Sequence, residues 1–166
     1  MNLSEFEFRF AGKQDGAALA ELMLEANRYY WGEADGAAEM TSKAADVLVN
    51  SRSGCRAVVA CDAGVLKGFA TVSVLHPAPN ESGTLFMKDL FVSKDARGSG
   101  LGKLFMQHLA KHAVELGYHR FDWTAETDNP RAIAFYDELN ASRVEEKVYF
   151  RLSDTELRAF ADNSKD

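Results

Sequence analysis

Residues 87–102 read Met-Lys-Asp-Leu-Phe-Val-Ser-Lys-Asp-Ala-Arg-Gly-Ser-Gly-Leu-Gly, and this stretch decides the fold of the chain. Its first six residues are typical of a strand, and a helix is expected to begin near Leu101. Between them, Gly98, Gly100 and Gly102 remove side chains from a loop, so its backbone N–H groups can approach a ligand closely. The first N–H groups of a helix have no partner inside it and carry the positive end of its dipole. The stretch therefore predicts an anion site suited to a phosphate or pyrophosphate.

Two common nucleotide-binding loops do not fit this stretch. The dinucleotide pattern G-x-G-x-x-G would need its third glycine where Lys103 stands. The Walker loop would need a glycine in place of Arg97 and a Ser or Thr in place of Leu104. The spacing that does fit is Arg-x-x-Gly-x-Gly, formed by Arg97, Gly100 and Gly102. The rest of the chain is needed to identify the ligand.

Length and charge limit the class of protein. The 166 residues are 46% hydrophobic and 27% charged, which predicts one soluble domain over residues 1–166 with a sizeable core. The net charge of −6 argues against nucleic acid as a partner. It is compatible with a cationic substrate, although most charge of this kind is solvated surface.

The cysteines and the first residues of the chain indicate the expected cellular compartment. Cys55 and Cys61 bound one apolar run, and as the ends of a strand they would lie about 20 Å apart, too far for a disulfide. Two unpaired cysteines fit a reducing cytoplasm. No basic-then-apolar leader follows Met1, and no apolar run has the length of a transmembrane helix. We therefore expect a cytoplasmic protein without membrane contact.

Hydrophobic periodicity predicts alternating strands and helices. Strands are expected at 6–10, 56–61, 66–75, 84–92, 121–126 and 148–152. Helices are expected from about Asp15 to Gly32, at 36–50, from Leu101 to Gly117, from Asn129 to about Leu139, and from Ser153 onward. This order describes one mixed α/β sheet with helices on its faces.

Two side-chain clusters have more than one interpretation. His108 and His112 have a spacing that could suit a metal, but no acidic or cysteine ligand stands at a matching spacing. We therefore expect both to pack or lie on the surface, and we expect no metal site. Residues 29–31, Tyr-Tyr-Trp, could line a substrate pocket, although packing at a helix end is the simpler interpretation.

Two segments resemble the GNAT N-acetyltransferases. The Arg97, Gly100 and Gly102 spacing resembles the acetyl-CoA pyrophosphate loop of that family. The segment 129–141 resembles its Asn-x-x-Ala-x-x-x-Tyr pattern, ending at Tyr136. Over nearly the whole chain, the order of elements looks like the GNAT fold. The resemblance implies a mixed, mostly antiparallel sheet with about four flanking helices, splayed between the strand before the glycine loop and the next strand.

Within the family, the Asp-Leu-Phe-Val run at 89–92 and the terminal strand and helix look most like the diamine and polyamine (spermidine/spermine-type) branch. The chain departs from that pattern at two places. Asn140 stands where a glycine is usual, and Asn tolerates the left-handed conformation that this position needs. Lys88 stands where the polyamine branch carries an acidic residue. A lysine there would repel a polyamine, which calls polyamine specificity into question.

The implied reaction is direct attack of a neutral amine on the thioester of acetyl-CoA. An amine with a pKa of about 10.4 is neutral in only about one molecule in two thousand at pH 7, so the enzyme must accept a proton. Asp89 is the first candidate base, followed by Glu126 and Asp122 on the next strand. The alternative for Asp89 is a buried structural acceptor. Tyr136 would hydrogen-bond or protonate the leaving thiolate, with positioning more important than driving force.

The resemblance also implies the donor-binding residues. Backbone groups of the splayed strand would bond the pantetheine arm, and one N–H would stabilise the oxyanion. The glycine loop would hold the pyrophosphate, and the start of the Tyr136 helix would contact the CoA arm or its adenosine end. The residues concerned are Leu90, Phe91, Val92, Arg97, Gly98, Ser99, Gly100, Leu101, Gly102, Lys103, Asn129, Arg131 and Ala132.

The expected function is therefore acetyl-CoA-dependent N-acetylation of a small amine by a homodimeric enzyme. The dimer is an expectation from the family and from the terminal strand and helix. Two alternatives stay open, a protein or peptide N-acetyltransferase of the same fold and a CoA-binding module without catalysis. The segment 29–50 and the loop 76–83 are expected to shape the acceptor pocket, and neither carries a motif.

Overall fold

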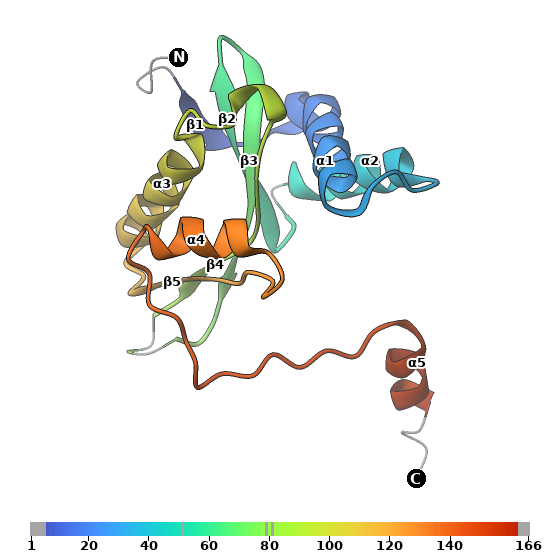
Figure 1. Cartoon of the computed structure of the whole chain (residues 1–166), viewed down its shortest axis with the longest axis vertical. Helices are drawn as coiled ribbons and strands as arrows, with labels where there is room; N and C mark the ends of the chain where they lie inside the picture. The colour runs from blue at the N-terminus through green and yellow to red at the C-terminus, as the bar shows by residue number, and fades with distance from the viewer. Residues whose placement is uncertain (1–5, 51, 79, 81, 163–166) are drawn as a thin grey trace. The chain divides into compact units, whose positions relative to one another are not determined.

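The structure is a computed structural model, and it describes residues 6–50, 52–78, 80 and 82–162 (Figure 1). The chain divides into two compact units, one ending at Ala125 and the other beginning at Glu126. Among the described residues, the sheet and the three longest helices belong to the first unit, and two shorter helices belong to the second.

A mixed sheet forms the centre of the first unit. Its strands lie side by side in the order β1 (Glu7–Phe10), β2 (Cys55–Asp62), β3 (Val65–Leu75), β4 (Thr84–Val92) and β5 (Arg120–Trp123). Strands β1 to β4 pair antiparallel with their neighbours, and β5 pairs parallel with β4. This arrangement confirms the predicted α/β fold with a mixed, mostly antiparallel sheet.

Helices cover both faces of this sheet. Helices α1 (Gly16–Trp31) and α2 (Ala37–Leu48) lie on one side, and α3 (Leu101–Glu115) lies on the other (Figure 1). On the α1 side, Leu19 and Phe91 belong to one buried apolar cluster. Burial of side chains of this size contributes roughly 1.5–3 kcal/mol each, so this cluster is a main source of stability.

On the other face, the sheet and α3 approach closely at Gly68 of β3. A Cβ atom at Gly68 would lie 2.9 Å from Cε2 of Phe105 and 2.7 Å from the carbonyl oxygen of Phe91. Phe105 is fully buried and meets the ring of Phe8 edge to face, with centroids 5.0 Å apart. The missing side chain at Gly68 is therefore what lets α3 pack against the strands.

Local signals end several elements where the sequence predicts. Ala63 and Gly64 form the turn between β2 and β3 with φ of 46° and 81°, a conformation that matches the twist of a hairpin. After α3, Gly117 has a φ of 76°, and the N–H of Tyr118 donates to the carbonyl of Ala113 at 2.9 Å. This is the Schellman ending expected where glycine stops a helix.

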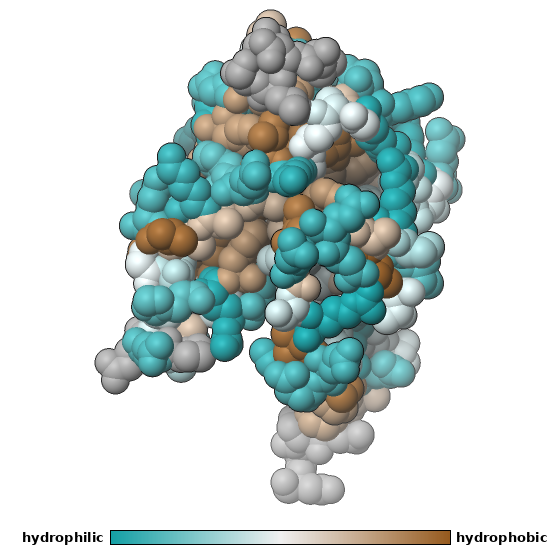
Figure 2. Space-filling model, turned by 60° about the vertical axis from the view of Figure 1, so that its left-hand side comes forward, coloured by the Kyte–Doolittle hydropathy of each residue, from teal (hydrophilic) through white to brown (hydrophobic). Residues whose placement is uncertain are grey.

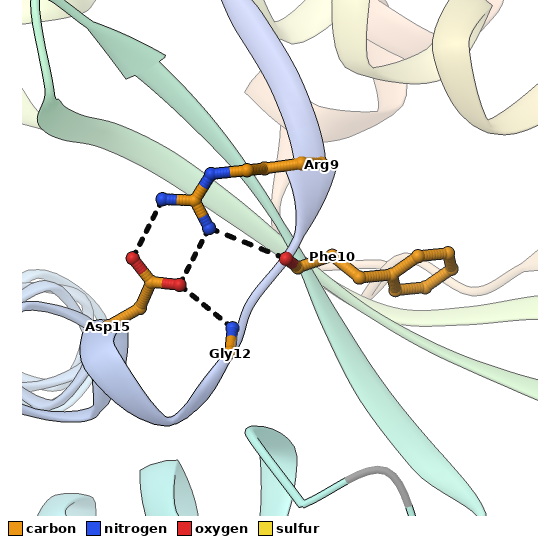
Figure 3. A network of polar contacts seen from close by, with 4 residues as sticks. All are labelled: Arg9, Phe10, Gly12 and Asp15. Carbon is orange, nitrogen blue, oxygen red and sulfur yellow. Dashed lines mark hydrogen bonds and ion pairs between the residues drawn. The ribbon is translucent and has the colours of Figure 1, made fainter.

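Arg9 of β1 and Asp15, at the start of α1, form a two-pronged ion pair (Figure 3). The guanidinium donates to the two carboxylate oxygens at 2.6 and 2.8 Å, and the N–H of Gly12 donates to one of them at 2.8 Å. The hydrogen bonds from Arg9 lower the pKa of Asp15, against the opposing effect of burial. Asp15 stands at the predicted N-cap position, but its carboxylate bonds Arg9 and the N–H of Gly12 rather than the helix amides.

The second unit contains α4 (Pro130–Asp137) and α5 (Asp154–Asp162). The side chain of Asn129 accepts a hydrogen bond from the N–H of Ala132 at 3.1 Å, which confirms the predicted N-cap before a proline. After α4, Asn140 has a φ of 57°, the left-handed conformation that the sequence predicts for it.

The predicted strand at 148–152 is wrong, because these residues have no regular secondary structure. No strand in the described part of the chain pairs with them, and an alternating apolar pattern needs such a partner to become a strand. Val148 and Phe150 are instead 73% and 88% exposed. On the face of the molecule in view, Figure 2 shows apolar surface among polar side chains.

The Arg9–Asp15 pair predicts a pH-dependent stability. Because the pKa of Asp15 is lower in the folded than in the unfolded chain, its stabilisation is present above about pH 4 and is lost as the pH falls through the folded-state pKa. We expect Asp15→Asn to lower the free energy of unfolding by about 2 kcal/mol at pH 7 and to flatten its acid dependence. Urea unfolding between pH 7 and pH 3 measures both effects.

The exposed pair of Glu39 and Lys43 on α2 supplies the control. Glu39→Gln removes one carboxylate from a solvated ion pair and is expected to change stability by less than about 0.5 kcal/mol. Equal stability losses for Asp15→Asn and Glu39→Gln would contradict a structural role for the Arg9–Asp15 pair.

Candidate functional site

A β-bulge interrupts β4 at Lys88. Thr71 of β3 pairs with Asp89, and the next residue of β3, Val72, pairs with Met87, so Lys88 has no partner in the register. Paired residues share a face of the sheet, whereas successive residues of a strand point to opposite faces. Asp89 therefore lies on the face of Thr71, and Met87 lies on the opposite face. Lys88, which follows Met87, is brought to the same face as Asp89.

Thr71 holds Asp89 at this bulge through two hydrogen bonds. The hydroxyl of Thr71 donates to Oδ2 of Asp89 at 2.9 Å, and the backbone N–H of Asp89 donates to the same hydroxyl at 3.1 Å. Thr71 is 4% exposed, whereas Asp89 lies on the surface of the first unit. The arrangement orients one carboxylate oxygen and leaves the other, Oδ1, without a hydrogen bond among the described residues. The carboxylate of Asp89 is thus fixed in direction by Thr71.

Strand β5 separates from β4 at the position of the bulge. The register of the two strands covers Thr84 to Met87 on β4 and ends at Trp123 on β5. Beyond Met87, residues 89–92 pair with β3, and residues 88–92 have no β5 partner among the described residues. This confirms the predicted splay. The backbone groups of β4 on this side are available to an extended ligand.

The glycine loop after β4 has the backbone geometry of an anion site. Gly98 and Gly100 have φ of 77° and 84°, and nothing lies within 4 Å of where a Cβ of Gly98 would stand. Ser99 closes the loop by donating its hydroxyl to the carbonyl of Ala96 at 2.7 Å. The first helical bond of α3 runs from the N–H of Leu104 to the carbonyl of Gly100 at 3.2 Å.

The N–H groups of Gly102 and Lys103 therefore precede the first intrahelical hydrogen bond and have no intrahelical acceptor. Together with the glycine conformations, they form a donor set of the kind that a pyrophosphate requires. The residues present fit the phosphate groups of CoA. Their contribution comes from the backbone, as the sequence predicts for this loop.

The side chain of Arg97 is directed towards α1. Its Nε donates to the carbonyl of Val92 at 3.1 Å, and its guanidinium lies 4.0 Å from the ring centre of Tyr29. A carboxylate oxygen of Glu25 lies 4.0 Å from Arg97 and accepts the N–H of Lys94 at 2.7 Å. Arg97 thus connects the glycine loop to the end of α1. Its role as a pyrophosphate ligand stays a prediction.

Residues 29–31 contribute an aromatic cluster at the end of α1. Tyr29 and Tyr30 both approach the ring of Phe91 at 6.4 Å, and both are about half exposed. Trp31 is more exposed and contacts the ring of Tyr30. The cluster therefore combines packing against β4 with open aromatic surface.

The predicted site residues fall into both units. The first unit holds Asp89, Asp122, Leu90, Phe91, Val92, Arg97, Gly98, Ser99, Gly100, Leu101, Gly102 and Lys103, and the second holds Glu126, Asn129, Arg131, Ala132 and Tyr136. In the second unit, α4 carries Tyr136 one residue before its end, and the side chain of Asn129 serves the cap.

The placement of Glu126 on a strand is wrong. Strand β5 ends at Trp123, and the carbonyl of Glu126 accepts the N–H of Asn129 at 3.0 Å in the turn before α4. The physical reason is the separation of β4 from β5, because residues beyond Trp123 have no ladder partner on β4. Asp122 does lie on β5.

The two histidines pack against β1. The imidazole of His108 stacks on the ring of Phe8 at 5.0 Å, and that of His112 meets the ring of Phe10 at 5.2 Å. Burial lowers the pKa of His108. Among the described residues, no three His, Cys, Asp or Glu side chains are grouped so as to hold a metal ion. In the same residues, no helix is both long enough and apolar enough to cross a membrane.

Thr71 is the site residue that the sequence does not reveal. It has no motif of its own, and it becomes visible only through its place opposite the bulge. Pairing register between two strands is a non-local property, and the apolar pattern of β4 does not mark Lys88 as unpaired. The one local signal is the pair of adjacent charged residues, Lys88 and Asp89, inside an apolar strand.

Comparison with known proteins agrees with this geometry. The family model described as Acetyltransferase (GNAT) family matches residues 17–141, which include the glycine loop, the bulge and the Tyr136 helix. The chain belongs to this family.

Two curated relatives and one solved structure illustrate the similarity. The chain is 32% identical over 95 residues to L-ornithine N5-acetyltransferase NATA1 of Arabidopsis thaliana, covering 57% of this chain and 42% of that protein. It is 32% identical over 81 residues to thialysine N-epsilon-acetyltransferase of Caenorhabditis elegans, covering 47% of this chain and 51% of that protein. The chain thus spans about half the length of the curated relatives it matches.

The solved structure is the integron cassette protein VCH_CASS6 from the mobile metagenome of V. cholerae. The two chains are 36% identical, with a TM-score of 0.86 over 95% of this chain and 98% of that one. The fold described above is therefore shared over nearly the whole chain.

The hydrogen bonds at the bulge predict how Thr71 variants behave. Thr71→Val keeps the shape but removes the acceptor of the Asp89 N–H, so we expect amide exchange at Asp89 to become about tenfold faster. Thr71→Ser keeps the hydroxyl and is expected to retain most of the protection. Residue-resolved hydrogen exchange measures the effect.

Thr41 on α2 gives a matched control, because its side chain is equally buried and its hydroxyl donates to the carbonyl of Ala38. Thr41→Val should leave exchange at Asp89 unchanged. Unchanged exchange at Asp89 in Thr71→Val would show that the hydroxyl does not hold the bulge.

Proposed function

We propose that this chain transfers the acetyl group of acetyl-CoA to the primary amine of a small molecule, by direct attack of the amine on the thioester. The observation that carries the proposal is the bulge of β4, which orients Asp89 where β4 has parted from β5. An exposed strand edge and a carboxylate at one point are what acyl transfer to an amine needs.

The donor would bind mainly to backbone. The edge of β4 at 90–92, which has no β5 partner among the described residues, supplies N–H and C=O groups for the amide-containing pantetheine arm, apart from the Val92 carbonyl that accepts from Arg97. The glycine loop from Arg97 to Lys103 supplies N–H groups for the pyrophosphate. Asn129, Arg131 and Ala132 are assigned to the CoA arm or its adenosine end. A backbone N–H of β4 stabilises the oxyanion that forms on the thioester carbonyl.

Proton transfer assigns roles to two side chains. Asp89 accepts a proton from the ammonium form of the substrate, directly or through water, because the attacking amine must be neutral. The nitrogen then forms a bond to the acetyl carbon and loses its second proton to water, and the carbon–sulfur bond breaks. Tyr136 hydrogen-bonds or protonates the departing thiolate. Glu126 is the second candidate base, and its place outside β5 makes Asp89 the stronger one.

The acceptor is proposed to be a small amine. The relatives named above are an ornithine and a thialysine N-acetyltransferase, and both names describe acetylation of an amino acid side chain. The diamine and polyamine branch stays the proposed position within the family. We further propose that residues 1–166 act as one cytoplasmic acetyltransferase domain.

Substitution of Asp89 and Tyr136 tests the proposal. We expect Asp89→Asn and Tyr136→Phe each to lower kcat for acetylation of an amine by about 100-fold, the usual contribution of acid–base catalysis. The dissociation constant for CoA should change little, since the donor contacts are assigned to backbone. Thiol release in a panel of amines, amino acids and polyamines measures turnover, and calorimetry measures CoA binding.

Glu126→Gln tests the second candidate base in the same assay. Glu115→Gln, on the exposed end of α3, is the control and is expected to leave turnover unchanged. Equal rates for wild type and Tyr136→Phe would remove the role assigned to Tyr136. Turnover of basic peptides alone would favour the protein acetyltransferase. CoA binding without turnover of any amine would favour the binding module.

We also propose a homodimer in which the apolar side chains at 148–152 pack against the partner. Their exposure in the single chain supports this, because Val148 and Phe150 have little apolar surface covered. We expect light scattering to give a dimer for wild type and a monomer for Val148→Lys combined with Phe150→Glu. Val114→Lys, at an equally exposed position of α3, should stay dimeric. A monomeric wild type would contradict the proposal.

A further inference from the structure

Lys88 is an exposed cation inside the strand that carries the candidate base. The bulge brings its side chain to the same face as Asp89, one residue away, where an unbroken strand would have placed it on the opposite face. Within the described residues, Lys88 forms no ion pair with Asp89 or with any other carboxylate. Its charge is therefore available to a ligand at this face.

The phosphates of the donor do not account for this charge. Lys88 lies four residues before the end of β4 at Val92, which corresponds to about 13 Å along a strand. The glycine loop comes after that end, and the N–H groups at the start of α3 are the donors proposed for the phosphates. Lys88 and the pyrophosphate site thus lie at different points along β4, and Lys88 is beside the carboxylate that serves the acceptor.

The charges at 88 and 89 are opposite and share one face. An acceptor that places its amine at Asp89 meets a cation at Lys88. The lysine side chain carries its ammonium roughly 6 Å from Cα, and neighbouring Cα atoms are about 3.8 Å apart, so the two charged groups can lie several ångströms apart. A short diamino acid has a carboxylate at about this separation from its side-chain amine. A diamine would place a second ammonium near Lys88, where like charges repel.

We propose that Lys88 is a specificity-determining residue that pairs with a carboxylate of the acceptor. The enzyme thereby selects small amines that carry a carboxylate, such as amino acids with a side-chain amine, over diamines of the same length. This inference rests on the proposed function and assigns its acceptor class. Lys88 contributes to binding of the acceptor and takes no part in proton transfer.

Two substrates with the same carbon chain test the assignment. L-Ornithine and 1,4-diaminobutane differ only by one carboxylate, so their kcat/KM ratio isolates its recognition. We expect wild type to favour L-ornithine at least tenfold, Lys88→Gln to bring the ratio near one, and Lys88→Glu to reverse it. The change should appear in KM for L-ornithine, with KM for acetyl-CoA unaltered.

Butylamine distinguishes attraction between Lys88 and a carboxylate from repulsion between Lys88 and a second ammonium. It has one amine and neither a carboxylate nor a second ammonium. Its kcat/KM should stay within about twofold in Lys88→Gln, while that of L-ornithine falls at least tenfold. Lys111→Glu, an exposed position of α3, repeats the charge change of Lys88→Glu away from β4 and should leave the ratio at its wild-type value. Calorimetry of the two substrates with the CoA-bound enzyme gives the same comparison without turnover.

A wild-type preference for 1,4-diaminobutane, or an unchanged ratio in Lys88→Gln, would overturn the role of Lys88 and leave the acetyltransferase intact. Absence of thiol release with every amine would overturn the proposed function instead. In that case, equal binding of L-ornithine to wild type and Lys88→Gln would overturn the Lys88 assignment as well, and weaker binding to the variant would uphold it.

Discussion

The register shift between β3 and β4 is the constraint on which the candidate site depends. With Thr71 opposite Asp89 and Val72 opposite Met87, one extra residue is accommodated in β4 without breaking the sheet. The register shift has three consequences at this point of β4. Two charged side chains share a face, a buried hydroxyl bonds one of them, and the partnership with β5 ends at the same point. A strand without the bulge would have put Lys88 and Asp89 on opposite faces.

Signals carried by a few neighbouring residues could be predicted from the sequence. The hairpin at Ala63 and Gly64, the helix stop at Gly117, the cap at Asn129 and the left-handed Asn140 all follow from conformational preferences of single residues. The glycine loop belongs to the same group, because the left-handed conformations of Gly98 and Gly100 are properties of single residues. The glycine loop and the segment that begins at Asn129 are also the ones on which the resemblance to the family is based.

Features that depend on a distant partner could not be predicted. Residues 148–152 alternate as a strand should, but the described chain offers them no neighbouring edge. Glu126 continues the pattern of β5, yet β4 has already diverged when it is reached, and its carbonyl serves the turn before α4 instead. The role of Thr71 could not be predicted either, since it depends on the pairing of Thr71 with Asp89 and not on the presence of a threonine as such.

The proposed donor contacts come mainly from backbone groups, whereas the proposed acceptor contacts come from side chains. The two kinds of contact therefore depend on the amino-acid sequence to different degrees. The edge of β4 and the amides of the glycine loop present the same groups whatever side chains surround them, so they suit a donor common to a family. Lys88 is different, because its side chain is exposed and forms no ion pair within the described residues. A substitution there alters the charge of the face proposed for the acceptor, and the exposed side chain is not part of the buried core. Under the proposed assignment, acceptor choice can therefore change at position 88 while the proposed donor site stays the same.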